Sequence, residues 1–200
     1  QPEWFKPIAV RANAVGVSRP VSQLALEQPH LDFDPMVEGR APKNPLLKKA
    51  PLKPTLPYAD RDAAISGGGL APAVMPPTIV NVEGMNNTAN GALFGFTVSP
   101  PDTNGDIGRT HYVQTVNLAV QVFNINGTPL TAPFKMSSLF TALGASNICA
   151  TDDDGDPIVL YDHLADRWMI SQFALTSPFH QCIAISQTGD PTGAYYVYDF

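Results

Sequence analysis

The sequence predicts an all-β domain of short antiparallel strands, preceded by an extended, proline-rich segment. Proline is unevenly placed, because 13 of the 20 prolines lie within residues 1–77. After residue 76 the chain alternates between runs rich in Val, Ile, Tyr, Phe and Thr and short stretches of Gly, Asn, Asp and Pro. Runs of β-branched and aromatic residues bounded by turn residues are typical of antiparallel strands.

Six runs in this second part are expected to form strands. They cover residues 93–98, 111–125, 157–161, 167–174, 181–186 and 194–200. Asn126-Gly127 is expected to close a hairpin after residue 125, because this dipeptide favours tight turns, and residues 162–166 are expected to form a longer loop. Consecutive strands of this kind form a meander, which occurs in sandwiches, barrels and propeller blades.

Only one helix is expected. Ser137 or Ser138 would cap a short stretch that contains Leu139, Phe140 and Leu143.

The first part, residues 1–75, is expected to be a strap or linker, and residues 76–200 the β-rich domain. Between residues 42 and 54 a proline recurs every three to six residues, which removes amide donors and excludes a helix interior or a central strand. Apolar side chains such as Leu24, Phe33 and Met36 are interspersed through this part. We therefore expect the strap to lay these side chains into grooves of the folded body.

The charge of residues 76–200 excludes nucleic-acid binding by this part of the chain. The whole chain has a net charge of −6, and residues 76–200 contain only three cationic side chains, Arg109, Lys135 and Arg167, against 11 acidic ones. Three cations do not supply a phosphate-neutralising surface. No run of roughly 18 apolar residues is present for a membrane span. The chain begins at Gln1 and not Met, as expected of a processed chain that has lost a signal sequence, with an artificially trimmed chain as the alternative.

The two cysteines, Cys149 and Cys182, each lie beside an expected strand. A disulfide would tie neighbouring strands together and indicate an oxidising compartment, with two buried thiols as the alternative.

Two acidic segments share one spacing, with oxygen-bearing side chains at alternate positions and a glycine after the second. The candidate ligands are Asp102, Asn104 and Asp106 in the first segment and Asp152, Asp154 and Asp156 in the second. Alternate oxygen ligands on a loop that folds back at glycine suit calcium, which takes six to eight oxygen ligands. The spacing resembles the first half of an EF-hand loop, but Val113 and His163 stand where that loop has its bidentate Glu. We therefore expect a calcium ion held by loops of a β-fold, with plain turn formation as the alternative.

The stretches PPDTNGDIG, GDPIVLYD and ADRW resemble the blade pattern of secreted bacterial β-propellers of the sialidase-like kind. The resemblance covers about half the chain and implies a fold, part of a β-propeller built from antiparallel meander blades. It implies no sialidase activity, because the Asp-box of sialidases is absent. A blade takes about 40 to 45 residues and a ring needs at least four blades, so residues 76–200 would supply at most three.

The run at residues 194–200 is expected to be an apolar edge strand. We therefore expect a second chain, or a missing C-terminal portion, to complete the sheet. A self-contained sandwich is the alternative.

No Gly-x-Ser-x-Gly, His-Glu-x-x-His, phosphate loop or dinucleotide fingerprint is present. The sequence predicts a secreted, calcium-stabilised binding or surface-associated module. The alternative is a secreted hydrolase of polysaccharide or peptide whose catalytic residues lie mostly outside this chain.

Overall fold

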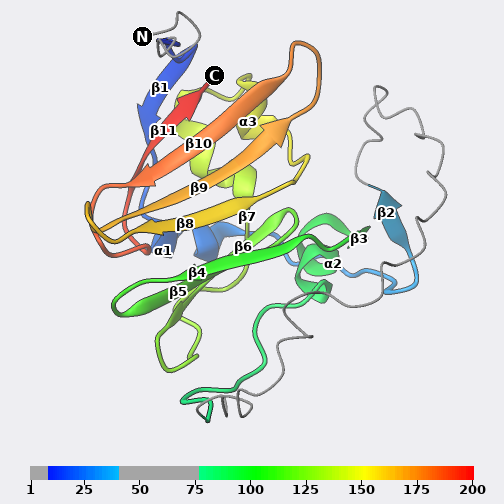
Figure 1. Cartoon of the computed structure of the whole chain (residues 1–200). Coiled ribbons are helices and arrows are strands. Elements are labelled where there is room, and N and C mark those ends of the chain that lie inside the picture. Colours follow the sequence, from blue (N-terminus) through cyan, green and yellow to red (C-terminus); the bar gives the residue numbers. More distant parts are fainter. Residues whose placement is uncertain (1–8, 41–76) are drawn as a thin grey trace, which may run out of the picture. The chain divides into compact units, whose positions relative to one another are not determined.

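The computed structural model describes residues 9–40 and 77–200, and the proline-rich stretch at residues 42–54 lies outside them. Of the described residues, 9–40 and 82–200 belong to one compact unit, the first unit. The first unit consists mostly of antiparallel β-sheets, so the expected all-β class is confirmed (Figure 1). Within the described residues no helix is long and apolar enough to cross a membrane.

The second half of the chain forms a four-stranded antiparallel meander. Its strands are β8 (Ile158–Asp162), β9 (Arg167–Ala174), β10 (His180–Ser186) and β11 (Tyr195–Asp199). These strands match the four expected runs closely, because the runs are rich in β-branched and aromatic residues. We call these four strands the second meander.

The strand β11 is not an edge strand, so that expectation was wrong. Strand β1 (Ala14–Val17) pairs with it in antiparallel register, with Gly16 opposite Val197. The resulting five-stranded sheet has the order β1-β11-β10-β9-β8. A segment of the expected strap therefore pairs with β11, for which a partner from another chain or from a missing C-terminal portion was expected.

Another four-stranded meander precedes the second meander in the chain. It consists of β4 (Thr103–Ile107), β5 (His111–Val116), β6 (Ala119–Asn124) and β7 (Phe134–Lys135), and we call it the first meander. The expected run 111–125 is thus two strands, which turn at Asn117, a residue with a φ of +46°. The Asn126-Gly127 turn is confirmed, since the Gly127 amide donates to the Asn124 carbonyl at 2.9 Å.

The expectation of a single helix was wrong. The helical segments are α1 (Val21–Leu24), η2 (Ala25–Glu27), α2 (Thr88–Phe94), η3 (Met136–Leu143) and α3 (Ile148–Thr151). Only η3 lies where a helix was expected, and neither serine caps it, because the Ser137 amide and hydroxyl both donate to Asp153. The others are one or two turns long, too short for a helical period to show in the sequence.

The expected strand at residues 93–98 is divided between a helix and a strand. Its first residues end α2, where Gly95 adopts a φ of +82° at the C-terminus. Its last residues belong to β3 (Thr97–Ser99), which pairs in parallel with β2 (Glu38–Arg40). In the expected strap, Leu24 is buried and the Phe33 ring lies against Gly91 of α2, whereas Met36 is exposed.

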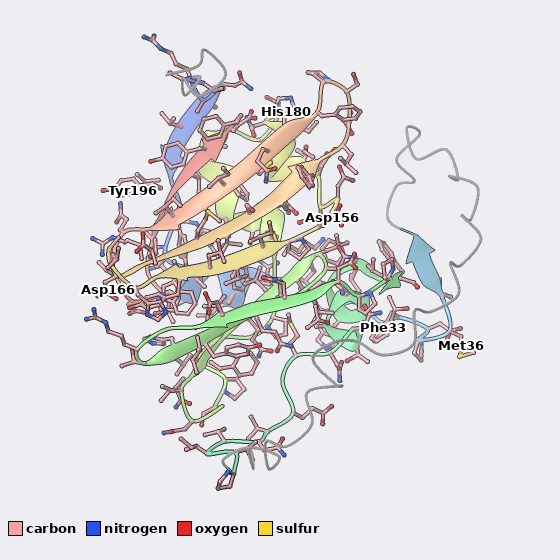
Figure 2. All side chains as sticks on the ribbon, in the orientation of Figure 1. Phe33, Met36, Asp156, Asp166, His180 and Tyr196 are labelled. Atoms are coloured by element: carbon pink, nitrogen blue, oxygen red, sulfur yellow. A yellow bond between two sulfur atoms is a disulfide. The ribbon has the colours of Figure 1, made fainter. Side chains whose placement is uncertain are left out.

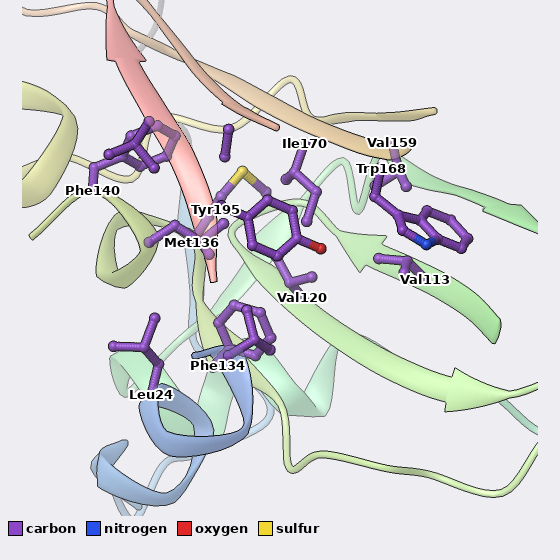
Figure 3. Packing of buried hydrophobic residues seen from close by; sticks show 14 of the residues in the cluster. Leu24, Val113, Val120, Phe134, Met136, Phe140, Val159, Trp168, Ile170 and Tyr195 are labelled. Atoms are coloured by element: carbon purple, nitrogen blue, oxygen red, sulfur yellow. The ribbon is translucent and has the colours of Figure 1, made fainter. Parts of the chain in front are cut away.

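The main core lies between the two meanders and the helical segments. Val113 and Val120 of the first meander face Val159, Trp168 and Ile170 of the second, as Figure 3 shows. Helical side chains fill the rest of the layer, among them Leu24, Met136 and Phe140. A smaller cluster covers the other face of the first meander, where Met85 and Leu93 pack on Phe123.

The expected disulfide between Cys149 and Cys182 is present, with a sulfur–sulfur distance of 2.02 Å. It joins α3 to β10 rather than two strands. Its position pins the helical layer to the middle of the five-stranded sheet.

Candidate functional site

The two meanders meet along their first strands. Strands β4 and β8 lie side by side in Figure 1, and two β4 side chains accept hydrogen bonds from the β8 backbone. The Val159 amide donates to Asn104 Oδ1 at 2.7 Å, and the Tyr161 amide donates to Asp106 Oδ2 at 2.8 Å. Because both contacts advance by two residues in the same direction, β4 and β8 run parallel. Side chains of β4 thus accept hydrogen bonds from the backbone amides at the edge of β8 that does not pair with β9.

This arrangement changes the interpretation of the first acidic segment. Its residues Asn104 and Asp106 were expected on a loop that folds back at Gly105, and that expectation was wrong. Residues 103–107 form a strand paired with β5, and alternate side chains point toward β8. The same spacing that suits a calcium loop also suits a strand with one polar face, and here pairing with β5 decides between them.

The second acidic segment does turn at its glycine, where Gly155 has a φ of +87°. Two of its candidate ligands bind protein donors. Asp152 accepts from the Thr176 hydroxyl at 2.8 Å, and Asp154 accepts from the Leu175 amide at 2.5 Å. These carboxylates hold the segment after β9 against the loop before β8.

Asp153, which was not a candidate ligand, is half-buried and accepts two hydrogen bonds from Ser137. Burial raises the pKa of Asp153 to about 6, although hydrogen bonds from Ser137 and the charge of Lys135 oppose the shift. The neighbouring charge of Asp154 raises the pKa further. Asp153 therefore holds the start of η3 through hydrogen bonds from Ser137. At neutral pH its ionised carboxylate lowers the stability of the folded state.

The remaining two candidate ligands, Asp102 and Asp156, come from different segments and lie near each other. Burial, and then the negative charge of Asp156, raise the pKa of Asp102. Both residues have a positive φ, +40° and +50°, and each precedes the first strand of its meander. Among the described residues no group of three or more His, Cys, Asp or Glu side chains is arranged to hold a metal ion.

A polar pocket opens at the other end of β4 and β8, where turns of both meanders meet. We call it the loop-end pocket. It has a volume of about 440 Å³ and is lined by Arg109, Thr110, His111, Tyr161, Asp166, Thr188, Gly189 and Asp190. Figure 2 places Asp156 and Asp166 at opposite ends of the second meander, so this pocket is separate from the acidic pair.

Hydrogen bonds and packing fix the walls of the loop-end pocket. The Tyr161 hydroxyl donates to Asp166 Oδ1, and this bond is the main reason that the pKa of Tyr161 is raised. The Asp166 carboxylate lies against Gly189, where a Cβ atom would come within 2.5 Å of it. Across the pocket, His111 Nε2 lies 3.9 Å from Asp190 Oδ1. The site thus offers carboxylate acceptors and the exposed Arg109 side chain around one opening.

A third polar cluster is structural. His180 Nδ1 lies 2.5 Å from Asp199 Oδ1, and Asn147 Nδ2 donates to Asp199 Oδ2 at 2.9 Å. Both Asp199 oxygens are therefore used, and the cluster links α3 to β10 and β11 beside the disulfide.

Sequence reasoning did not find the loop-end pocket. Its lining comes from three turns that are far apart in the sequence, so only the fold brings these residues together. No family model matches the chain, and no match was found among curated proteins or solved structures.

Proposed function

We propose that this chain is part of a secreted β-propeller-type protein that acts as a ligand-binding module. The observation that carries the proposal is the relation between the meanders. Both are four-stranded and antiparallel, and their first strands run parallel and side by side. Successive blades of a propeller are related in this way, with like strands next to one another around a common axis.

The outer face of the five-stranded sheet supports a further layer. Most of its side chains are apolar, and the apolar ones are exposed or half-buried, while Asp162, Arg167, Ser171 and Gln181 are the polar residues on it. We call this the outer face, and its apolar residues are Val15, Val17, Ile158, Leu160, Met169, Phe173, Ile183, Ile185, Tyr196 and Tyr198. Contiguous apolar patches of this kind mark interaction surfaces. In a propeller, repeating the step from the first meander to the second would place another β-sheet on this face.

The disulfide supports secretion. Disulfides persist in oxidising compartments and are rare in the cytosol. Cys149 and Cys182 are buried and bonded, and the bond joins two layers of the core.

The loop-end pocket supports the binding role. It is open and polar, it lies where turns of both meanders converge, and its side chains offer both donors and acceptors. Residues for binding are commonly placed on loops that a rigid scaffold holds. Glycan and peptide arrays probed with the protein test this role, with Arg109→Ala as the variant expected to lose binding. Net release of reducing ends or amines would instead favour the hydrolase.

A charge placed on the outer face tests the architecture. In the complete natural protein, Leu160→Lys is expected to lower the melting temperature, because a covering sheet would bury the ammonium group. Leu164→Lys is the matched control, since Leu164 is 99% exposed in the turn after β8. An unchanged melting temperature in both variants would mean that the outer face is free surface, and the proposal would fail.

A further inference from the structure

We propose that a calcium ion binds between the two meanders, held by the carboxylates of Asp102 and Asp156 and the amide oxygen of Asn117. The site lies at the starts of β4 and β8, at the end opposite the loop-end pocket. It does not depend on the proposed binding function.

The fold brings the two carboxylates together. Asp102 precedes β4 and Asp156 precedes β8, and because these strands run parallel and side by side, their starts lie at the same end. Both residues adopt a positive φ, which non-glycine residues other than Asn and Asp rarely do. The backbone is thus held in an uncommon conformation at two equivalent points, one from each meander.

The charges at this point are uncompensated within the described residues. Both side chains are exposed, and neither Asp102 nor Asp156 forms an ion pair with a Lys, Arg or His side chain of the described chain. Two carboxylates at the same end of neighbouring parallel strands, without a cationic partner among these residues, favour a bound cation.

Asn117 provides an independent indication of a ligand. Its side chain is 1% exposed, and its Oδ1 atom is buried without a hydrogen-bond partner among the described residues. Its Nδ2 atom donates to the Pro100 carbonyl at 2.9 Å and lies 3.5 Å from Asp102 Oδ2, which fixes the orientation of the amide. Oδ1 lies beside Gly155, the residue before Asp156.

Gly155 makes room for this oxygen. A Cβ atom at residue 155 would lie 1.9 Å from Asn117 Oδ1, and the φ of +87° also favours glycine. The unpaired amide oxygen is thus directed into the segment that carries Asp156. A buried acceptor left without a partner is destabilising, and a cation would satisfy it.

Oxygen ligands of this kind select a hard cation. Calcium accepts an irregular set of carboxylate and amide oxygens and completes its shell with water, whereas magnesium requires near-octahedral geometry. With two carboxylates the dissociation constant is expected to be on the order of 0.1–1 mM, as in extracellular calcium modules.

Native mass spectrometry and thermal melting in calcium, magnesium or chelator test the site. The wild-type protein is expected to bind one calcium ion per chain, and its melting temperature should rise with the logarithm of the calcium concentration. Asp102→Asn and Asp156→Asn should each lose this response. Both variants are expected to fold, because Asn tolerates a positive φ as well as Asp does.

Asp154→Asn is the matched control, since Asp154 belongs to the same acidic segment but accepts from the Leu175 amide, which an Asn oxygen can also do. It should respond to calcium as the wild type does. The proposal is overturned if the wild type shows no calcium response at 10 mM, roughly ten times the weakest expected dissociation constant, if either Asp102→Asn or Asp156→Asn keeps the response, or if Asp154→Asn loses it. Equal binding of magnesium would overturn the assignment to calcium.

Discussion

Asp153→Asn is expected to change the unfolding free energy, relative to the wild type, more favourably at neutral pH than at pH 5. In the wild type, burial raises the pKa of Asp153 from 3.8 to about 6, so the folded state binds a proton more tightly than the unfolded state. The stability that this proton contributes is fully present below pH 3.8 and is lost as the pH rises through 6. Asparagine keeps an acceptor for the Ser137 amide and has no charge to bury.

The magnitude follows from the two pKa values. A rise from 3.8 to about 6 corresponds to ~3 kcal/mol between the fully protonated and fully ionised limits. Between pH 7.5 and pH 5 the wild type should gain about 1.4 kcal/mol of unfolding free energy that Asp153→Asn does not gain. The charges that face Asp153 are Lys135, which opposes the shift, and Asp154, which adds to it, and both are unchanged by the substitution.

Urea unfolding followed by tryptophan fluorescence measures this difference, because Trp168 is 1% exposed in the core. The free energies of the two proteins are compared at pH 5 and pH 7.5. Asp32→Asn, which changes an exposed carboxylate, is the control and should follow the wild type. Parallel pH dependence of the wild type and Asp153→Asn would refute the account of the buried carboxylate.

Three further predictions concern the packing of the two meanders. Asn104→Leu should lower the unfolding free energy by about 1–3 kcal/mol in urea titration, because it leaves a buried β8 amide unpaired, whereas Asp106→Asn keeps an acceptor and should cost less; equal effects would contradict the bridging role. Gly108→Ala should lower the melting temperature and cost about 1–3 kcal/mol, because a Cβ atom there would come within 2.6 Å of the buried indole; an unchanged melting temperature would show that the turn has room. Replacing Cys149 and Cys182 by Ser should cost about 3–4 kcal/mol by urea unfolding, given a sequence separation of 33 residues, and a loss below 1 kcal/mol would mean that the disulfide does not hold the layers together.

The second meander could be predicted from the sequence because its strands are rich in β-branched and aromatic residues and their turns contain Gly, Asp or Pro. Strand β4 could not, because Asp-Thr-Asn-Gly-Asp has the composition of a turn, and only its pairing with β5 and β8 makes it a strand. The partner of β11 was equally hidden, since the four residues of β1 lie about 180 residues away, within the part that was expected to be a strap.

The candidate sites show the same limit. Asp102 and Asp156 could be singled out by composition, but the separate tasks of Asn104 and Asp106 depend on which strand edge they face. Asn117 carries no sequence signal, because its importance comes from burial and from the glycine opposite it.

The proposed architecture requires the outer face to be an interior layer of a larger β-structure. Hydroxyl-radical footprinting of the complete natural protein tests this within one chain, because three methionines report different environments. Met36 is 86% exposed, Met136 is buried, and Met169 lies on the outer face. The account predicts that Met169 is oxidised about as slowly as Met136, since another sheet covers it. Oxidation of Met169 at a rate close to that of Met36 would contradict the account and leave the two meanders as a free-standing pair.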